Sequence, residues 1–285
     1  MRIGVVFPQT ELGGDPAVVR AYGEGVEGLG FTHILAYDHV VGADPTVHRG
    51  WDGPYDIDST FHEPFVVFGY LAAITSLELV TGVIILPQRQ TALVAKQAAE
   101  VDLLTGGRFR LGVGLGWNAV EYEALGEKFG NRGKRSEEQI ELMRRLWTER
   151  SVTFDGRYHT VTAAGLAPPP VQRPIPVWIG AASDRGLERA GRLADGWFPM
   201  TAPGPGLEHA REQVRRAAAA VGRDPASLGM EGRVSWTGDP DKTAAGIAAW
   251  RAAGATHLSV NTMNAGLATV DDHLAALERV AADLK

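Results

Sequence analysis

The sequence predicts a single-domain α/β protein of the (β/α)8-barrel class. The first observation is an alternation of eight short apolar runs with eight longer amphipathic ones along 285 residues. The second is that most of the short runs lack apolar–polar alternation, which is typical of strands buried on both faces of a parallel sheet. The third is length, since barrels of this class commonly reach this size as one domain. A doubly wound sheet normally needs fewer units and is the second choice.

The predicted strands are rich in valine, isoleucine, leucine and aromatic residues. They cover residues 3–8, 32–38, 79–86, 109–114, 176–180, 196–200, 230–236 and 256–261. The predicted helices cover residues 16–29, 63–75, 92–104, 136–147, 184–193, 206–221, 241–253 and 271–284. Gly30 after the first helix and Asp271 at the start of the last are typical helix-end signals.

Two insertions interrupt this alternation. Residues 42–62, after the second strand, are too long for an ordinary βα turn and carry Trp51, Tyr55 and Phe61, which predicts a functional loop such as a lid. Before the fifth strand, residues 152–161 predict a hairpin, and a stiff Pro-rich segment follows it at 167–176. No repeat or linker divides the chain, so residues 1–285 are predicted to form one domain.

The composition excludes several classes of function. Without cysteine, the chain has no disulfides, thiolate nucleophiles or iron–sulfur ligands. Its 28 basic and 34 acidic residues give a net charge of -6 with no basic run, so we expect no nucleic-acid partner. No window approaches the ~18 uninterrupted apolar residues of a membrane span. The N-terminal apolar run is too short for a signal peptide. We therefore expect a cytoplasmic protein that does not bind membranes.

Active sites in this fold lie at the C-terminal ends of the strands. Asp38 and His39 follow the second strand, and a histidine beside a carboxylate in such a place can donate or accept a proton near neutral pH. A loop cap and a histidine bonded to a backbone carbonyl would explain the pair equally well. With His48 and His62 the pair could also be assembled into a barrel metallohydrolase. No H-x-H is present on the first strand, however, and we predict no metal.

Two further strand ends are rich in small residues. The segment GVGLGWN at 112–118 has alternate glycines that would let a ligand approach the backbone, although tight strand-to-loop geometry is an equal explanation. The segment WIGAASDRG at 178–186 leads from a strand into a helix, whose free N–H groups would hold an anion with help from Ser183. A simple N-cap at Ser183 or Asp184 is the competing interpretation.

Taken together, these segments resemble the bacterial luciferase-like monooxygenase superfamily, and within it the branch of deazaflavin (coenzyme F-420)-dependent oxidoreductases. The resemblance covers nearly the whole chain. Its most specific stretch is residues 80–126, VTGVIILPQRQTALVAKQAAEVDLLTGGRFRLGVGLGWNAVEYEALG. The Asp38-His39 pair and the segments PVWIGAAS and RLADGW reinforce it.

The resemblance implies roles for individual residues. Asp38 would hydrogen-bond the polar edge of the cofactor ring, and His39 would transfer a proton beside the reacting carbon. A non-proline cis peptide, for which Gly82–Val83 is the candidate, would back the ring. The cofactor's side chain and phosphate would be held by Gly114, Gly116, Trp117, Asn118 and Glu121 and by Gly180, Ala181, Ala182 and Ser183.

The function that the resemblance implies is hydride transfer between coenzyme F-420 and a small, rather apolar organic substrate. An FMN-dependent monooxygenase that uses O2 is the alternative, and a non-catalytic cofactor-binding barrel is a third possibility. Hexose-phosphate dehydrogenases of this branch carry a glutamate at the position of Trp117, and the sequence shows no basic pocket for a sugar phosphate. Both facts argue against sugar phosphates as substrates. The resemblance also implies a homodimer.

Overall fold

The computed structural model describes residues 1–282 and confirms the predicted barrel. Parallel strands form a ring in the order β3-β2-β1-β11-β10-β9-β8-β5, and the pairing of β3 with β5 closes it. The third strand position is split, since β4 (Ile84–Ile85) continues β3 (Glu78–Thr81) after a break. The other barrel strands are β1 (Arg2–Val6), β2 (His33–Ala36), β5 (Phe109–Gly114), β8 (Val177–Ala181), β9 (Gly196–Pro199), β10 (Gly229–Ser235) and β11 (His257–Asn261).

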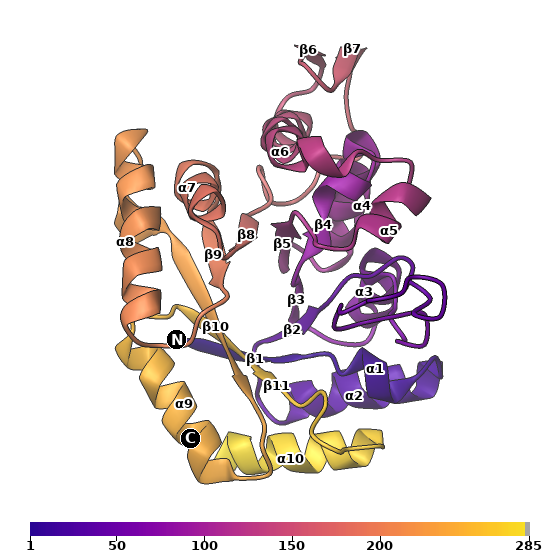
Figure 1. The fold of residues 1–285 in the computed structure, drawn as a ribbon, viewed down its shortest axis with the longest axis vertical. Coiled ribbons are helices and arrows are strands. Elements are labelled where there is room, and N and C mark those ends of the chain that lie inside the picture. Colours follow the sequence, from indigo (N-terminus) through magenta and orange to yellow (C-terminus); the bar gives the residue numbers. More distant parts are fainter. Residues whose placement is uncertain (283–285) are drawn as a thin grey trace.

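The long helices surround this ring on the outside (Figure 1). They are α2 (Pro16–Gly28), α3 (Pro64–Ala72), α4 (Thr91–Leu104), α6 (Arg132–Thr148), α7 (Asp184–Leu193), α8 (Pro205–Ala220), α9 (Pro240–Ala252) and α10 (Val270–Ala282). All are predicted, although α6 begins at Arg132 rather than at residue 136. Residues 283 and 284 of the last predicted helix lie outside the described residues. The short helices α1 (Gln9–Leu12) and α5 (Ala119–Ala124) were not predicted.

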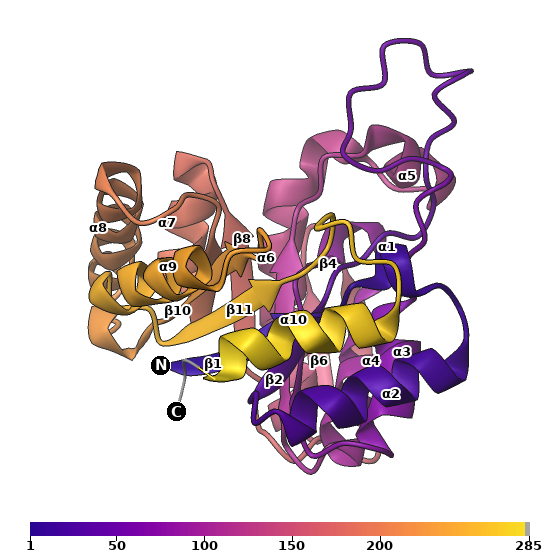
Figure 2. The ribbon, with the colours of Figure 1, turned by 90° about the horizontal axis from the view of Figure 1, so that it is seen from below.

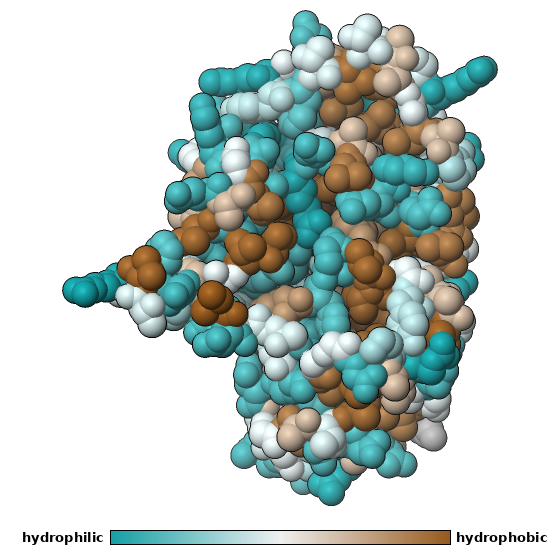
Figure 3. All heavy atoms as spheres, turned by 90° about the vertical axis from the view of Figure 1, so that its right-hand side faces the viewer, coloured by the Kyte–Doolittle hydropathy of each residue, from teal (hydrophilic) through white to brown (hydrophobic). Residues whose placement is uncertain are grey.

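Both insertions are present. Residues 42–62 contain no helix or strand and project from the mouth of the barrel (Figure 2). Figure 3 shows the same projection at its left, with a hydrophilic tip and apolar side chains nearer the body. The predicted hairpin is confirmed, because β6 (Val152–Asp155) pairs antiparallel with β7 (Thr160–Ala164). It lies outside the ring, beyond α6 (Figure 1).

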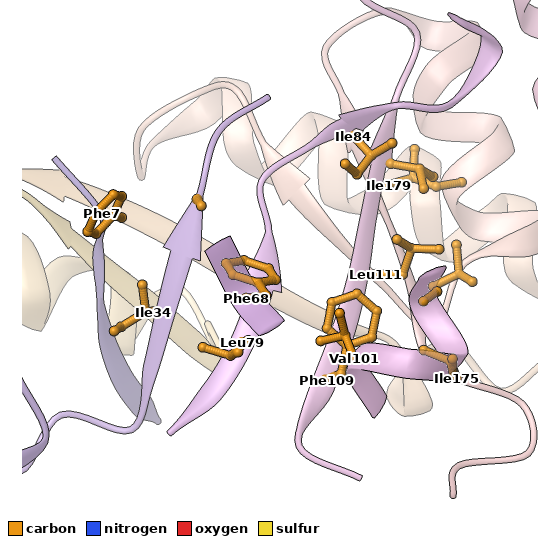
Figure 4. Packing of buried hydrophobic residues seen from close by; sticks show 14 of the residues in the cluster. Phe7, Ile34, Phe68, Leu79, Ile84, Val101, Phe109, Leu111, Ile175 and Ile179 are labelled. Atoms are coloured by element: carbon orange, nitrogen blue, oxygen red, sulfur yellow. The ribbon is translucent and has the colours of Figure 1, made fainter. Parts of the chain in front are cut away.

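The main hydrophobic core lies between the strands and the helices. Phe68 of α3 and Val101 of α4 pack toward the outward-facing side chains of β3 and β5, among them Leu79, Phe109 and Leu111 (Figure 4). Each of these side chains is at most 2% exposed, and burying one contributes about 1.5–3 kcal/mol to folding. This layer fixes the strands and therefore the loops at their C-terminal ends.

The interior of the barrel is filled in two layers beneath those loops. In the lower layer, Arg110 donates to Glu78 Oε1 at 2.9 Å and to Glu231 Oε2 at 2.7 Å, and His33 Nε2 lies 3.0 Å from Glu231 Oε1. Burial raises the pKa of Glu231, but Arg110 and His33 outweigh it and hold the pKa well below its usual range. The upper layer is apolar and comprises Val6, Leu35, Val80 and Met263. The space above this layer remains open.

Candidate active site

A cavity of about 640 Å³ opens at the C-terminal ends of the barrel strands. Its wall is formed by the ends of β2, β3, β5, β8, β9 and β10, by part of the projecting loop and by α6 and α7. Most of the predicted site residues meet there: Asp38, His39, Gly82, Val83, Gly114, Gly116, Trp117, Gly180, Ala181, Ala182 and Ser183. Asn118 and Glu121 do not line it.

The break between β3 and β4 forms a shelf inside this cavity. The peptide bond Gly82–Val83 is cis, as the resemblance implies. A Cβ at Gly114 would lie 2.5 Å from Val83 Cγ2, and one at Gly180 would lie 3.3 Å from Val83 Cγ1. The Val83 side chain therefore occupies room that two glycines of neighbouring strands leave free. The result is an apolar surface at Val83 on the cavity wall.

His39 lines the same cavity, and three aromatic rings pack around it. Its ring centroid lies 5.0 Å from that of Tyr55, 4.8 Å from Phe61 and 5.7 Å from Trp117. Trp117 also packs against Trp51 at 5.5 Å, so the projecting loop and the segment after β5 meet over the histidine. Of the three aromatic loop residues, Tyr55 lines the cavity, and Trp51 and Phe61 pack against its wall. They shield one side of His39 from water.

Glu121 lies behind His39, at the start of α5. Its Oε1 is 3.6 Å from His39 Nδ1, which is an ion-pair separation and longer than a hydrogen bond. Val40 N–H donates to Oε1 at 2.6 Å and Gln88 Nε2 donates to Oε2 at 2.9 Å. Burial raises the pKa of Glu121, but the His39 ring and these two donors outweigh it and hold the pKa below its usual value. A buried carboxylate therefore faces Nδ1 of the histidine.

Asp38 is buried, and other residues of the protein donate hydrogen bonds to its carboxylate. Arg89 Nη2 donates to Oδ1 at 2.8 Å, and the Ile85 N–H donates to Oδ2 at 3.2 Å. Burial raises the pKa of Asp38, and Arg89 and Ile85 offset only part of that effect. Because both oxygens have partners, this geometry ties the end of β2 to the shelf strand.

Two predicted residues cap helices. The Asn118 side chain accepts the N–H groups of Val120 at 3.0 Å and Glu121 at 3.2 Å, which explains why α5 begins there and places Glu121 behind His39. Ser183 Oγ accepts the Gly186 N–H at 3.3 Å at the start of α7. The structure therefore shows the N-cap, and Ser183 also lines the cavity.

Two arginines on the cavity wall were missed in the sequence analysis. Arg132 is the first residue of α6, and Arg189 lies on α7, where its Nε donates to Glu137 Oε1 at 3.0 Å. Neither residue belongs to a strand end. The segment NRGKR at 131–135 is a signal for Arg132 alone, and no sequence signal marks Arg189. Arg132 has no carboxylate partner among the described residues, whereas Arg189 shares its charge with Glu137. With Ser183 they form the end of the cavity best suited to an anion.

The remaining histidines do not join His39. His62 Nε2 lies 2.9 Å from the Gly13 carbonyl, and His48 packs against Trp51 at 6.4 Å. Among residues 1–282, no three histidine, aspartate or glutamate side chains are arranged to hold a metal ion. Of the helices that the structure describes, none is long and apolar enough to cross a membrane.

The fold and the cavity define a barrel with an active-site mouth, and comparison with known proteins places it in a family. The sequence profile of the luciferase-like monooxygenases matches residues 1–283. The chain therefore belongs to the luciferase-like monooxygenase family and is an enzyme.

Individual relatives carry the two kinds of cofactor that the resemblance implies. An uncharacterized protein of Mycobacterium tuberculosis is 42% identical over 139 residues, 48% of either chain. An FMNH(2)-dependent dimethylsulfone monooxygenase of Pseudomonas putida is 31% identical over 172 residues, 59% of this chain and 47% of that one. The chain thus matches about half the length of these curated relatives. The structure of an F-420-dependent secondary alcohol dehydrogenase with an F-420–acetone adduct has a TM-score of 0.81 at 18% identity, covering 100% and 99% of the two chains.

Proposed function

We propose that this enzyme is a deazaflavin (coenzyme F-420)-dependent oxidoreductase that acts on a small organic substrate, with His39 as the proton-transfer residue. The observation that supports a flavin-type cofactor is the cavity itself, and the resemblance of residues 80–126 favours F-420 over FMN. The cavity combines an apolar shelf at Val83, a histidine on the same cavity wall and an end suited to an anion at Arg132 and Arg189. These three features correspond to a planar ring, a reacting position and a phosphorylated side chain.

The residues present fit such a cofactor. Since Gly114 and Gly180 have no Cβ, the Val83 side chain fits between their strands, and a ring system would lie on top of it. Arg132, Arg189 and the N-terminus of α7 would hold the phosphate through charge and N–H donors. When bound, the cofactor supplies the hydride chemistry, while the protein supplies orientation, water exclusion and proton management.

His39 and Glu121 would act as a unit in the proton transfer. A carboxylate that faces Nδ1 favours the proton on that nitrogen and leaves Nε2 for the substrate. The present separation of 3.6 Å would shorten when substrate binds, since catalytic hydrogen bonds are often long in ligand-free structures. Asp38, whose oxygens are both occupied, is a positioning residue that holds the shelf.

A second candidate is an FMN-dependent monooxygenase that uses O2. The observation in its favour is the 31% identity with the FMNH(2)-dependent dimethylsulfone monooxygenase. The two cofactors share a ring shape and a phosphate, so the shelf and the two arginines suit both. They differ in the atom at ring position 5, which decides reactivity with oxygen.

Equilibrium titration separates the two candidates. The purified protein is titrated anaerobically with F-420, FMN and reduced FMN, and binding is followed by the change in cofactor fluorescence or absorbance. We expect F-420 to bind more tightly than either form of FMN by at least about tenfold, ~1.4 kcal/mol. When oxygen is added to the complex with reduced F-420, we expect no oxygen consumption. Preferential binding of reduced FMN followed by oxygen uptake would establish the monooxygenase instead.

A further inference from the structure

One charged side chain of the cavity wall is used neither by the shelf nor by the anion-binding end. Arg233 lies near the C-terminal end of β10 and lines the cavity mouth. Its Nη1 donates to the Tyr37 hydroxyl at 2.9 Å, and its guanidinium carbon lies 5.7 Å from the centre of the Tyr37 ring. Arg233 and Tyr37 therefore form a small polar group at the end of β2 and β10.

The strand geometry aims Arg233 into the barrel. A Cβ on Gly232 would collide with Trp250 of the outer helix α9, so residue 232 faces outward. Side chains alternate along a strand, and residues 231 and 233 must therefore face inward. Glu231 does so in the buried ion network, and Arg233 lies one step above it, at the level of the cavity.

Arg233 is exposed to solvent at the cavity mouth, and its charge has no carboxylate partner in the described part of the chain. Within residues 1–282, no carboxylate lies within 4.0 Å of its guanidinium nitrogens, whereas Arg89, Arg110 and Arg189 each have such a partner. Glu231, the nearest acid along the strand, is occupied by Arg110, His33 and Ser259. A guanidinium in this state presents a planar set of donors that suits a carboxylate.

Apolar side chains line the cavity beside Arg233. Tyr37 and Phe198 pack on the apolar layer of the barrel interior, and Met200, which is 60% exposed, lines the same mouth. The charge of Arg233 also reaches Tyr55. Burial raises the pKa of the Tyr55 phenol, and the positive charge of Arg233 offsets part of this rise. Since the Tyr55 ring lies 5.0 Å from that of His39, one wall connects Arg233 to the proton-transfer residue.

We propose that Arg233 determines substrate specificity and that the substrate is a small organic acid. Its carboxylate binds Arg233 and the Tyr37 hydroxyl, and its apolar body lies along Phe198 and Met200 with the reacting carbon near His39. This inference rests on the proposed function, in which the cavity brings substrate and cofactor together. It refines the expectation of a rather apolar substrate by adding one anionic group at a defined place.

The test is calorimetric titration with matched pairs of acids and their amides: benzoate with benzamide, phenylacetate with phenylacetamide, and hexanoate with hexanamide. Wild type, Arg233→Met and Arg233→Lys are titrated, loaded with whichever cofactor binds and also without cofactor. Arg215→Met, an exposed residue of α8 that does not line the cavity, is the control with the same loss of charge. Cofactor affinity is measured separately for every variant.

In wild type we expect at least one acid to bind at least about tenfold more tightly than its amide. Arg233→Met should abolish that preference, Arg233→Lys should retain part of it, and Arg215→Met should leave it unchanged. The proposal is overturned if no acid of the panel exceeds its amide, or if the preference survives in Arg233→Met. It is also overturned if Arg233→Met weakens cofactor binding instead. Because the cofactor-free arm is independent, failure of the F-420 assignment alone would leave the acid preference intact.

Discussion

Replacing Glu121 by glutamine probes the histidine partner without changing the size of the side chain. The carboxylate accepts two short hydrogen bonds, from Val40 N–H at 2.6 Å and from Gln88 Nε2 at 2.9 Å. Glutamine can keep both contacts if the Gln88 amide rotates, but each loses its charge assistance. A bond to a charged group contributes about 1.5–3 kcal/mol and a neutral one about 0.5–1.5, so we expect a loss of about 2 kcal/mol in unfolding free energy.

The loss of stability in Glu121→Gln should depend on pH in a defined direction. The folded-state pKa of Glu121 is below its usual value, so its stabilising contribution is present above the usual value near 4.5. It is lost as the pH falls through the lowered folded-state value. The difference between wild type and Glu121→Gln should therefore be full at pH 7 and should shrink in acid. In addition, nitrogen chemical shifts of His39 should show less of the Nδ1–H tautomer in the variant.

Glu123→Gln is the matched control, since it removes the same charge from an exposed position of the same helix. Chemical unfolding of the three proteins at pH 7 and at several acidic pH values is the assay. The reasoning is refuted if Glu121→Gln loses no more stability than Glu123→Gln. It is also refuted if the His39 tautomer is unchanged.

Three further perturbations test other parts of the site and fold. His39→Ala should lower turnover by about 10²–10⁴-fold and leave cofactor affinity largely intact, whereas lost affinity with unchanged turnover would contradict its role. Gly114→Ala places a methyl group 2.5 Å from Val83 Cγ2 and should cost about 1–3 kcal/mol of stability and weaken cofactor binding; Gly130→Ala, which meets no atom within 4 Å, should do neither. Glu138 accepts the N–H groups of Arg157 and Tyr158 and pairs with His159, so Glu138→Gln should loosen the hairpin by about 1 kcal/mol and speed its proteolysis at pH 7. Burial raises the pKa of Glu138, but these partners outweigh it and hold the pKa below its usual value, so the stabilising effect should fade in acid. Glu141→Gln, at an exposed position of the same helix, is the control. Equal proteolysis of the two variants would show that Glu138 does not stabilise the hairpin.

The barrel follows from the sequence because its signals are local. Each strand is a short apolar run, each helix has its own periodicity, and the hairpin turns at a glycine, so no long-range contact is needed to recognise them. The break between β3 and β4 lies inside one continuous apolar run, which periodicity alone cannot divide. Similarly, α6 starts four residues early, in the polar segment RGKR that shows no apolar face.

The sequence predicts which residues line the site better than it predicts which side chains contact each other there. Asp38 and His39 are adjacent in sequence and suggest a dyad, yet their partners lie far away: Asp38 binds Arg89, and His39 faces Glu121. Such pairs depend on how strands β2, β3 and β5 are ordered around the ring. The two arginines of the anion-binding end come from helices, whose surfaces carry many similar residues. Only the closed fold brings them to one cavity.

A crystal structure with coenzyme F-420 would show whether a flavin-type cofactor lies across the mouth of this barrel. We predict that the ring will lie on Gly82–Val83 between Gly114 and Gly180, with its reacting edge toward His39. The phosphate should lie at the start of α7, within reach of Arg132 and Arg189. A ring bound elsewhere, or a phosphate held by other residues, would contradict the account.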